Sequence, residues 1–128
     1  MGLVLSTRDV DGFQRAKAAI GAGMAVLCAR AGVAPAELQR VVTTGTFGKF
    51  LDIQNAQAIG LLPPVPMARV ESYENLALSG CEQWLLSSEG TGALDSVRSK
   101  ARLLYLAACP EFEERFVQGL FLAPMRGA

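Results

Sequence analysis

The pattern of apolar and polar residues predicts a long helix near the start of the chain. One face of this helix consists of residues that recur every three or four positions: Phe13, Lys17, Ile20, Met24, Leu27, Cys28 and Ala31. Ser6 can accept a hydrogen bond from the backbone of Asp9, whose carboxylate reaches back, so the pair predicts a capping box. Gly32 is the expected C-terminal cap. Gly21 and Gly23 inside the helix predict the close approach of a neighbouring element.

Shorter helices and strands alternate along the rest of the chain. Strands are predicted at 40–44, 68–73 and 101–107, and helices at 34–40, 52–59, 77–86, 93–100 and from Pro110 onwards. The first of these strands is expected to be buried. Prolines make 61–66 an extended connector, and 87–92 is typical of a turn. This alternation predicts an α/β layer fold in one domain, residues 1–128.

Two later helices each present a recognisable face. In the helix at 77–86 this face is Ala77, Gly80, Cys81, Trp84 and Leu85, and its small residues predict a backbone packed closely against something. In the last helix an apolar stripe is formed by Phe112, Phe116, Val117, Leu120 and Phe121.

Composition and charge narrow the possible partners. Of the 128 residues, 51% are hydrophobic and 19% are charged, which is typical of a globular protein. Twelve basic residues balance twelve acidic ones, so no long-range field favours nucleic acid or an anionic membrane. Lys17 and Arg30 interrupt the first apolar helix, and no segment predicts a membrane span or a leader sequence. The expected location is the cytoplasm.

Catalytic residue types are sparse. Cys28, Cys81 and Cys109 are far apart in apolar surroundings, which favours buried, reduced thiols over a metal or redox role. The chain has no histidine, from which we expect neither a zinc site nor Ser-His or Cys-His catalysis. No pair of carboxylates has acid/base spacing. We therefore expect no catalytic residue, no metal ligand and no turnover by the isolated chain.

A glycine-containing turn is the first candidate binding element. In the stretch "RVVTTGTFGKFLD", residues 40–52, a β-branched strand runs into Gly45, and Gly48 follows three residues later. The spacing is not that of a P-loop or of a dinucleotide fingerprint. Gly45, Thr46, Phe47 and Gly48 can form a purely structural turn, or they can let a flat ligand approach bare backbone.

Lys17 is the second candidate, because it lies on an otherwise apolar helical face. One interpretation is a lysine whose stem lies in the core while its ammonium reaches water. The other is a donor to a ribose hydroxyl or a phosphate.

Several segments together resemble one protein family. They are "LSTRDVDGFQRAKAAIGAG", "VVTTGTFGKFLD", "AIGLLPPVP", "ENLALSG" and "PEFEERFVQGLF", in this order, between Leu5 and Leu122. They are similar to the C-terminal part of the reductive activators of corrinoid enzymes, ferredoxin-like proteins with an actin-like (ASKHA) ATP-binding domain.

The resemblance implies a fold and a nucleoside site. The fold is a ribonuclease H-like or actin-like lobe, with a mixed sheet flanked by helices. In that architecture the glycine turn, Gly45–Gly48, contacts the adenosine of ATP, and the first helix offers Gln14 and Lys17 to the nucleoside. Asn75 carries over from a family Gly-Asn pair.

The resemblance also implies a function. Family members use ATP with magnesium to help drive electron transfer from an iron–sulfur cluster to a corrinoid protein, which returns cobalt from Co(II) to Co(I). The partners are then a corrinoid protein or corrinoid-dependent methyltransferase and the rest of the chain's own polypeptide. A [2Fe–2S] cluster is expected in a missing N-terminal part, so we expect a C-terminal lobe from a longer iron–sulfur protein.

Departures from the family pattern keep other functions open. Thr43, Thr44 and Thr46 stand where the family usually has alanine or glycine, Glu74–Asn75 replaces Gly-Asn, and Cys109 replaces an aspartate. The alternative is a non-catalytic interaction module that keeps the fold but has lost the nucleotide. A small-molecule kinase lobe is a third possibility. A lobe cut from its neighbour would also expose apolar surface, which predicts self-association.

Overall fold

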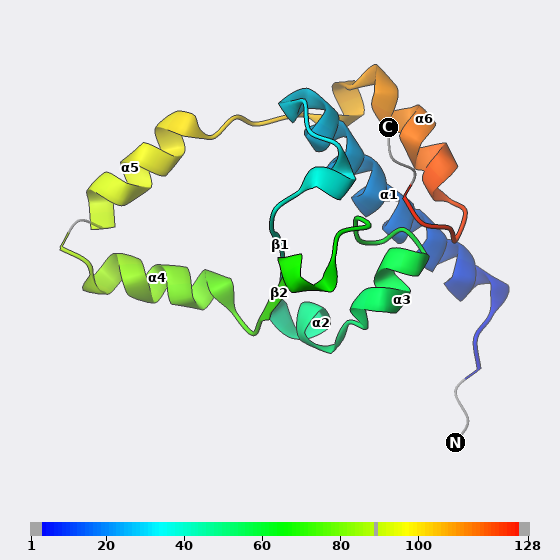
Figure 1. Cartoon of the computed structure of the whole chain (residues 1–128), viewed down its shortest axis with the longest axis horizontal. Coiled ribbons are helices and arrows are strands. Elements are labelled where there is room, and N and C mark those ends of the chain that lie inside the picture. Colours follow the sequence, from blue (N-terminus) through cyan, green and yellow to red (C-terminus); the bar gives the residue numbers. More distant parts are fainter. Residues whose placement is uncertain (1–3, 89, 126–128) are drawn as a thin grey trace. The chain divides into compact units, whose positions relative to one another are not determined.

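The computed structural model describes residues 4–88 and 90–125, and these divide into two compact units. Unit 1 contains Met1–Val41, Asp52–Val70 and Tyr105–Ala128. Unit 2 contains Val42–Leu51 and Glu71–Leu104. Figure 1 labels their helices and strands. That the whole chain acts as one domain stays a prediction.

The long first helix, α1 (Thr7–Ala31), has both predicted ends. Ser6 and Asp9 form the capping box: the backbone N–H of Ser6 donates to the Asp9 carboxylate (2.9 Å), and the N–H of Asp9 donates to the Ser6 hydroxyl (3.3 Å). The Ser6 hydroxyl also donates to the Asp9 carboxylate (2.6 Å), and this bond, together with the bond from the Ser6 backbone N–H, lowers the pKa of Asp9. Gly32 ends the helix with a φ of +67°, in the left-handed region.

The buried face of α1 differs from the predicted face. Its buried residues are Lys17, Ala18, Ala22, Gly23, Val26 and Cys28. Phe13, Ile20 and Leu27 are 44%, 52% and 55% exposed, so their predicted burial is wrong. The reason is a neighbouring helix that packs too closely for large side chains, because a methyl group at Gly119 would lie only 3.2 Å from Cα of Ala18.

The two glycines inside α1 do meet neighbouring elements, as predicted. A methyl group at Gly21 would lie 3.2 Å from the carbonyl oxygen of Gly60, and one at Gly23 would lie 3.1 Å from Cδ1 of Leu106. These approaches compensate for the low helix propensity of glycine.

The partner of α1 is α6 (Pro110–Gly119), which begins with proline as predicted. Arg30 near the end of α1 pairs with Glu111 in the first turn of α6 (2.8 Å). The predicted apolar stripe is only partly covered: Phe112 and Phe116 stack at a centroid distance of 6.3 Å, but Phe121 is 72% exposed.

Short elements complete unit 1. They are the 3-10 helices η1 (Pro35–Glu37), η2 (Met67–Arg69) and η3 (Leu106–Ala108) and the helix α3 (Ile53–Ala58). Asp52 caps α3 as predicted, accepting from the N–H of Asn55 (2.9 Å), and Gly60 follows its end with a φ of +75°. The connector at 61–66 contains neither helix nor strand, but it bends at residues 61, 62 and 64, so the predicted extended form is wrong. The bends allow local hydrogen bonds: the N–H of Val65 donates to Pro63 O (2.8 Å), and the Gln57 amide donates to Pro63 O (2.9 Å) and Val65 O (2.7 Å).

The strands β1 (Val41–Thr44) and β2 (Val70–Tyr73) form a two-stranded sheet, and all but the first residue of each strand belongs to unit 2. The hydroxyls of Thr43 and Ser72 lie 2.8 Å apart, and two residues further along both strands the N–H of Gly45 donates to Glu74 O (3.1 Å). Both strands therefore run in the same direction. The predicted burial of β1 is wrong except at Thr43, which is 9% exposed.

The predicted third strand is wrong. Residues 101–105 have no regular structure, and η3 follows. Leu103 and Tyr105 are 78% and 71% exposed. The sequence of this segment favours a strand, but a strand also needs the edge of another strand to complete its hydrogen bonds, and here none pairs with it in the described chain.

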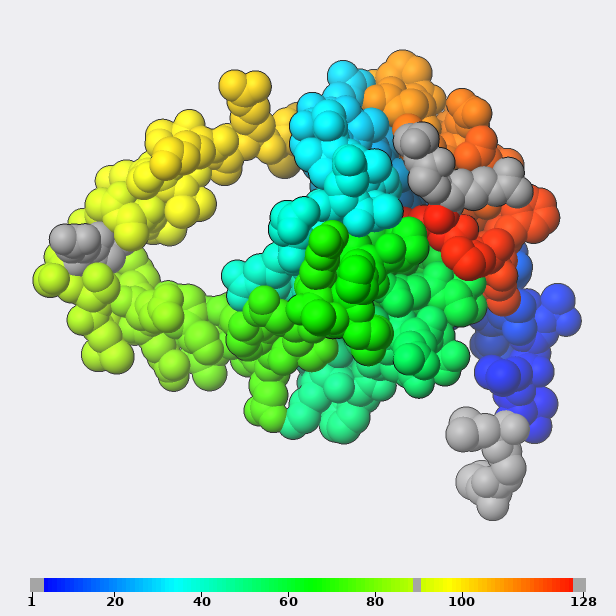
Figure 2. Space-filling view, in the orientation of Figure 1, coloured from blue at the N-terminus to red at the C-terminus, as the bar shows by residue number. Residues whose placement is uncertain are grey.

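The remaining helices are α4 (Leu76–Leu86) and α5 (Gly90–Lys100), and α4 has no buried residue. Figure 2 shows atoms of both helices (yellow-green to yellow) at the molecular surface. The predicted packing of the α4 face is wrong within the described chain, since Trp84 is 46% and Leu85 74% exposed. The turn predicted at 87–92 is shorter, because α5 begins at Gly90, and Glu89 lies outside the described residues. No described helix is long and apolar enough to cross a membrane.

Candidate functional site

The glycine segment that follows β1 begins a helix and is not a bare turn. Helix α2 (Gly45–Phe50) starts at Gly45, which has a φ of +83°. This left-handed conformation favours glycine, because other residues incur a steric penalty there. The N–H of Gly45 is held by Glu74 O, so the bend is fixed to the end of β2.

The two glycines of this segment have different surroundings. A methyl group at Gly45 would meet nothing within 4 Å, so its backbone faces open space. At Gly48 a methyl group would lie 3.1 Å from Cβ of Thr43, and Gly48 is buried. Gly48 therefore allows α2 to pack on β1, whereas Gly45 leaves backbone accessible.

Unit 2 brings Asn75 close to this bend. The Thr44 hydroxyl accepts from the N–H of Leu76 (3.1 Å), which ties the end of β1 to the start of α4. Asn75 caps α4 by accepting from the N–H of Leu78 through its side-chain oxygen (3.0 Å), a bond that does not use its amide nitrogen. Thr46 is exposed and Phe47 is 69% exposed. Gly45, Thr46, Phe47 and Asn75 thus gather accessible groups in one unit.

Gln14 and Lys17 belong to unit 1, where both bind the end of α6. The Lys17 ammonium donates to the carbonyl oxygens of Gly119 and Phe121, each at 2.6 Å. The Gln14 amide donates to Leu120 O (3.1 Å). These side chains satisfy carbonyl groups that the end of a helix leaves without partners.

The interpretation of Lys17 as a lysine with its ammonium in water is wrong. The residue is only 3% exposed. Burial lowers the pKa of Lys17 below its ordinary value, because the charged form loses hydration. Its two carbonyl partners replace part of that hydration.

The predicted site residues are therefore divided between the two units: Gly45, Thr46, Phe47, Gly48 and Asn75 in unit 2, and Gln14 and Lys17 in unit 1. A role of either group toward a nucleoside stays a prediction. The link from Gln14 and Lys17 to residues 119–121 was not anticipated. The only sign of this link in the sequence was that two polar residues, Gln14 and Lys17, occur on the side of α1 that carries small residues.

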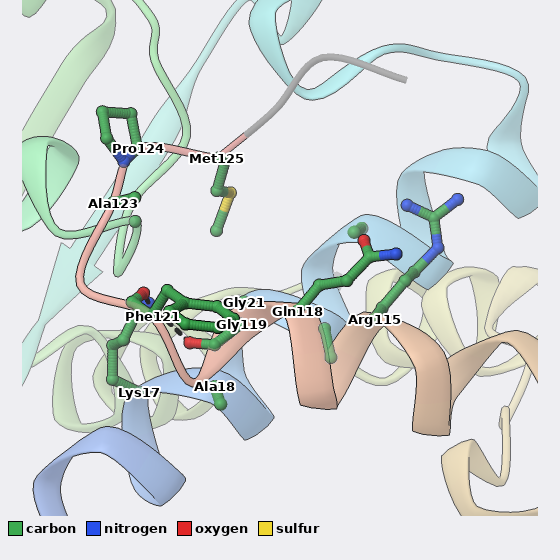
Figure 3. Close-up of a pocket in the computed structure, with 13 residues that line it drawn as sticks. Lys17, Ala18, Gly21, Arg115, Gln118, Gly119, Phe121, Ala123, Pro124 and Met125 are labelled. Carbon is green, nitrogen blue, oxygen red and sulfur yellow. Dashed lines mark hydrogen bonds between the residues drawn. The ribbon is translucent and has the colours of Figure 1, made fainter.

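Unit 1 also contains a cavity of about 310 Å³. Its walls come from α1, from α6 and from the segment that follows α6, and Figure 3 shows the side chains that line it. Two cations, Lys17 and Arg115, are among the lining residues, which include no acid. The sequence analysis did not predict this cavity.

The cysteines do not form a cluster. Cys28 and Cys109 are buried and reduced, as predicted, but Cys81 is exposed, so its predicted burial is wrong. Cys81 lies on α4, all of whose residues are exposed, so no apolar neighbour covers it. Among the described residues, no group of three or more cysteines and acids could hold a metal ion.

Known proteins match the chain over nearly its whole length. The model of a family described as the C-terminal domain of RACo, the ASKHA domain, matches residues 1–127. The corrinoid activation enzyme RamQ of Eubacterium limosum is 35% identical over 115 residues, which are 90% of this chain and 19% of that protein. A solved structure named reductive activator for corrinoid, iron-sulfur protein is 31% identical, with a TM-score of 0.82 over 94% of this chain and 19% of its own. The chain thus spans about a fifth of the length of these relatives.

Proposed function

Because the chain belongs to the family of C-terminal ASKHA domains of RACo, we propose that it acts as the nucleotide-coupled lobe of an ATP-dependent reductive activator. The activator would return a corrinoid protein from the Co(II) to the Co(I) state. Family membership agrees with the resemblance expected from the sequence, and the mixed helix and strand architecture agrees with an actin-like fold.

The observation that carries this proposal is the open backbone at Gly45. A residue with a φ of +83° and free space at its Cα presents main chain to which a flat nucleoside can come close. Exposed Thr46 and Phe47 flank this surface, and the amide nitrogen of Asn75 supplies a donor beside it. These groups fit a nucleoside better than a phosphate chain, because no cation of α2 is unpaired: Lys49 forms an ion pair with Glu74.

The domain would contribute binding and conformational coupling rather than redox chemistry. ATP with magnesium, when bound, would supply the free energy that separates two conformations, and the electron would come from a [2Fe–2S] cluster in another part of the polypeptide. Gly45–Gly48 and Asn75 would hold the nucleoside. Gln14 and Lys17, which we also assign to the nucleotide site, would act through their hold on the carbonyls of residues 119–121, since both side chains already donate there.

A second candidate function is favoured by α4 and α5. Residues 74–88 are all exposed, among them Leu85 (74%) and Leu86 (87%), and an uncovered apolar helix of 11 residues is marginal in water. In this alternative the domain is an interaction module, and α4 binds the rest of its own polypeptide or a second copy.

Hydrogen exchange of the α4 amides should then be much slower in a full-length protein than in this chain. Equally fast exchange in both would contradict a covered α4.

A direct test of the first proposal measures Co(I) formation by visible absorption. The full-length protein that contains this domain, with its cluster reduced, is mixed with the Co(II) corrinoid protein, with and without ATP and magnesium. We expect Co(I) to accumulate only with ATP. Gly45→Asn should reduce the ATP-dependent rate by about tenfold, because asparagine tolerates a positive φ but places a side chain in the open space.

A matched control is Gly32→Asn, since Gly32 also has a positive φ (+67°) and nothing within 4 Å of an added methyl group. It should leave the rate unchanged. Co(I) formation that is independent of ATP, or equal effects of the two substitutions, would contradict the proposal. An ATP-independent protein that still binds its partner would favour the interaction module.

A further inference from the structure

The cavity of unit 1 has one apolar wall built from very small residues. Ala18, Gly21, Ala22 and Ala25 follow one another along α1 and line this wall. Ala18 and Ala22 are 0% and 2% exposed, so the wall continues into the core, whereas Ala25 is only half-buried. The resulting volume of about 310 Å³ lies at the lower end of the range for small-molecule sites, about 300–1,000 Å³.

The polar lining of the cavity carries positive charge. Arg115 and Gln118 lie one turn apart on α6, and Figure 3 shows their side chains extending from the same side of the helix. Lys17 lies at the opposite, closed part of the lining, where two of its three N–H groups are bonded to Gly119 O and Phe121 O.

Arg115 is the group best placed to meet a ligand. It is half-buried, and no hydrogen bond or ion pair joins it to another described residue. Glu111, one turn earlier on α6, already pairs with Arg30 (2.8 Å). The amide nitrogen of Gln118 donates to Glu114 (3.1 Å), which leaves the side-chain oxygen of Gln118 available as an acceptor. Arg115 interacts electrostatically with Glu111, but Glu111 forms its ion pair with Arg30, so the planar guanidinium of Arg115 still has donors for a carboxylate or a phosphate.

From these observations we infer that the cavity is a binding site for a small organic anion with a flat apolar part. The charged group of the ligand binds Arg115, and the apolar part lies beside Gly21 and Ala25, the members of the α1 wall that are not fully buried. This site belongs wholly to unit 1, whereas Gly45–Gly48 belong to unit 2. The cavity shares Lys17 with the residues assigned above to the nucleotide site, but the contact inferred here is made by Arg115, which is not part of that assignment.

The test is a titration of the ¹⁵N-labelled 128-residue chain with benzoate, followed by NMR. Benzoate should shift the amide resonances of Ala18, Ala22 and Met125 saturably, with a dissociation constant of about 1 mM. Benzamide has the same shape without the charge and should bind at least about tenfold more weakly. Arg115→Gln should weaken the binding of benzoate to the same degree. The control is Arg8→Gln, because Arg8 is an exposed residue of α1 that does not line the cavity; this substitution should leave the binding of benzoate unchanged.

Three outcomes would overturn this inference. They are the absence of saturable shifts, equal binding of benzoate and benzamide, and unchanged binding in Arg115→Gln. Ala25→Phe fills the cavity from its half-buried edge and should abolish binding. If that variant fails to fold, the Arg115→Gln variant and the comparison of benzoate with benzamide still test the anion site. Displacement of benzoate by ATP with magnesium would assign the cavity to the nucleotide site and contradict a separate anion site.

Discussion

At the scale of single residues, Lys17 shows how a buried charge can hold a helix end. Its ammonium meets two carbonyl oxygens at 2.6 Å near the C-terminus of α6, where the helix dipole also favours a cation. Burial alone would destabilise the charged form, and it lowers the pKa of Lys17 accordingly. The charge is tolerated because backbone oxygens take the place of water.

Lys17→Met tests this interpretation, because methionine keeps the buried stem and removes the donor. The carbonyls of Gly119 and Phe121 then lose their partner, and we expect the free energy of unfolding to fall by about 1–3 kcal/mol in urea denaturation. The control is Lys49→Met, which removes an exposed pair with Glu74 and should cost less than about 1 kcal/mol. Equal effects of the two substitutions would contradict a capping role for Lys17.

A second prediction at the scale of single residues concerns Gly60, where a side chain should lower the stability of the protein. It has a φ of +75°, and an added methyl group would lie 2.4 Å from the carbonyl oxygen of Ala123. Gly60→Ala should therefore destabilise the protein by about 2 kcal/mol or more. Gly12→Ala, in the middle of α1 with nothing within 4 Å, should instead stabilise it by about 0.5–1 kcal/mol. Thermal or urea unfolding of both variants measures the contrast, and changes of the same sign would contradict it.

At the scale of elements, the capping box of α1 has a testable pH dependence. The folded-state pKa of Asp9 lies below 3.8, because the Ser6 hydroxyl and backbone N–H bind its charged form. Its contribution to stability is therefore complete above pH 3.8 and is lost as the pH falls through the folded pKa. The difference in unfolding midpoint between the wild type and Asp9→Asn should shrink over that window. A difference that stays constant down to strongly acidic pH would contradict the capping box.

Elements whose ends are set by local chemistry could be predicted from the sequence. The Ser6–Asp9 box, the Asp52 cap and Pro110 fix helix termini through bonds that span only a few residues. Both strands were also identified, β1 by its β-branched residues, but their parallel pairing was not predicted. For the candidate site, the sequence located Gly45 at the end of a strand but could not distinguish its open surroundings from the packed ones of Gly48.

Features that depend on distant partners could not be predicted. The buried face of α1 is set by the close approach of Gly119, more than 80 residues away in the chain, so large residues such as Ile20 point outward. The run at 101–107 has the composition of a strand, but no edge among residues 4–88 and 90–125 pairs with it. The cavity arises where residues of α1, α6 and the segment after α6 meet, and no single stretch of sequence encodes it.

At the scale of the whole molecule, the chain accounts for about a fifth of the relatives it matches. Unit 2 presents both an open backbone at Gly45 and uncovered apolar residues on α4, and both features suit a domain that works beside other domains. In the proposed activator, nucleotide binding would bias the conformation of the whole protein, while the electron transfer takes place between cluster and corrinoid. The isolated chain is accordingly expected to show no ATP hydrolysis.

The most direct measurement is a calorimetric titration of the full-length protein with ATP and magnesium, comparing the wild type with Gly45→Asn and Gly32→Asn. The proposal predicts saturable binding that Gly45→Asn weakens by at least about tenfold and Gly32→Asn leaves within about twofold. Unchanged affinity in Gly45→Asn, in a protein that otherwise binds ATP, would contradict a nucleoside contact at this backbone.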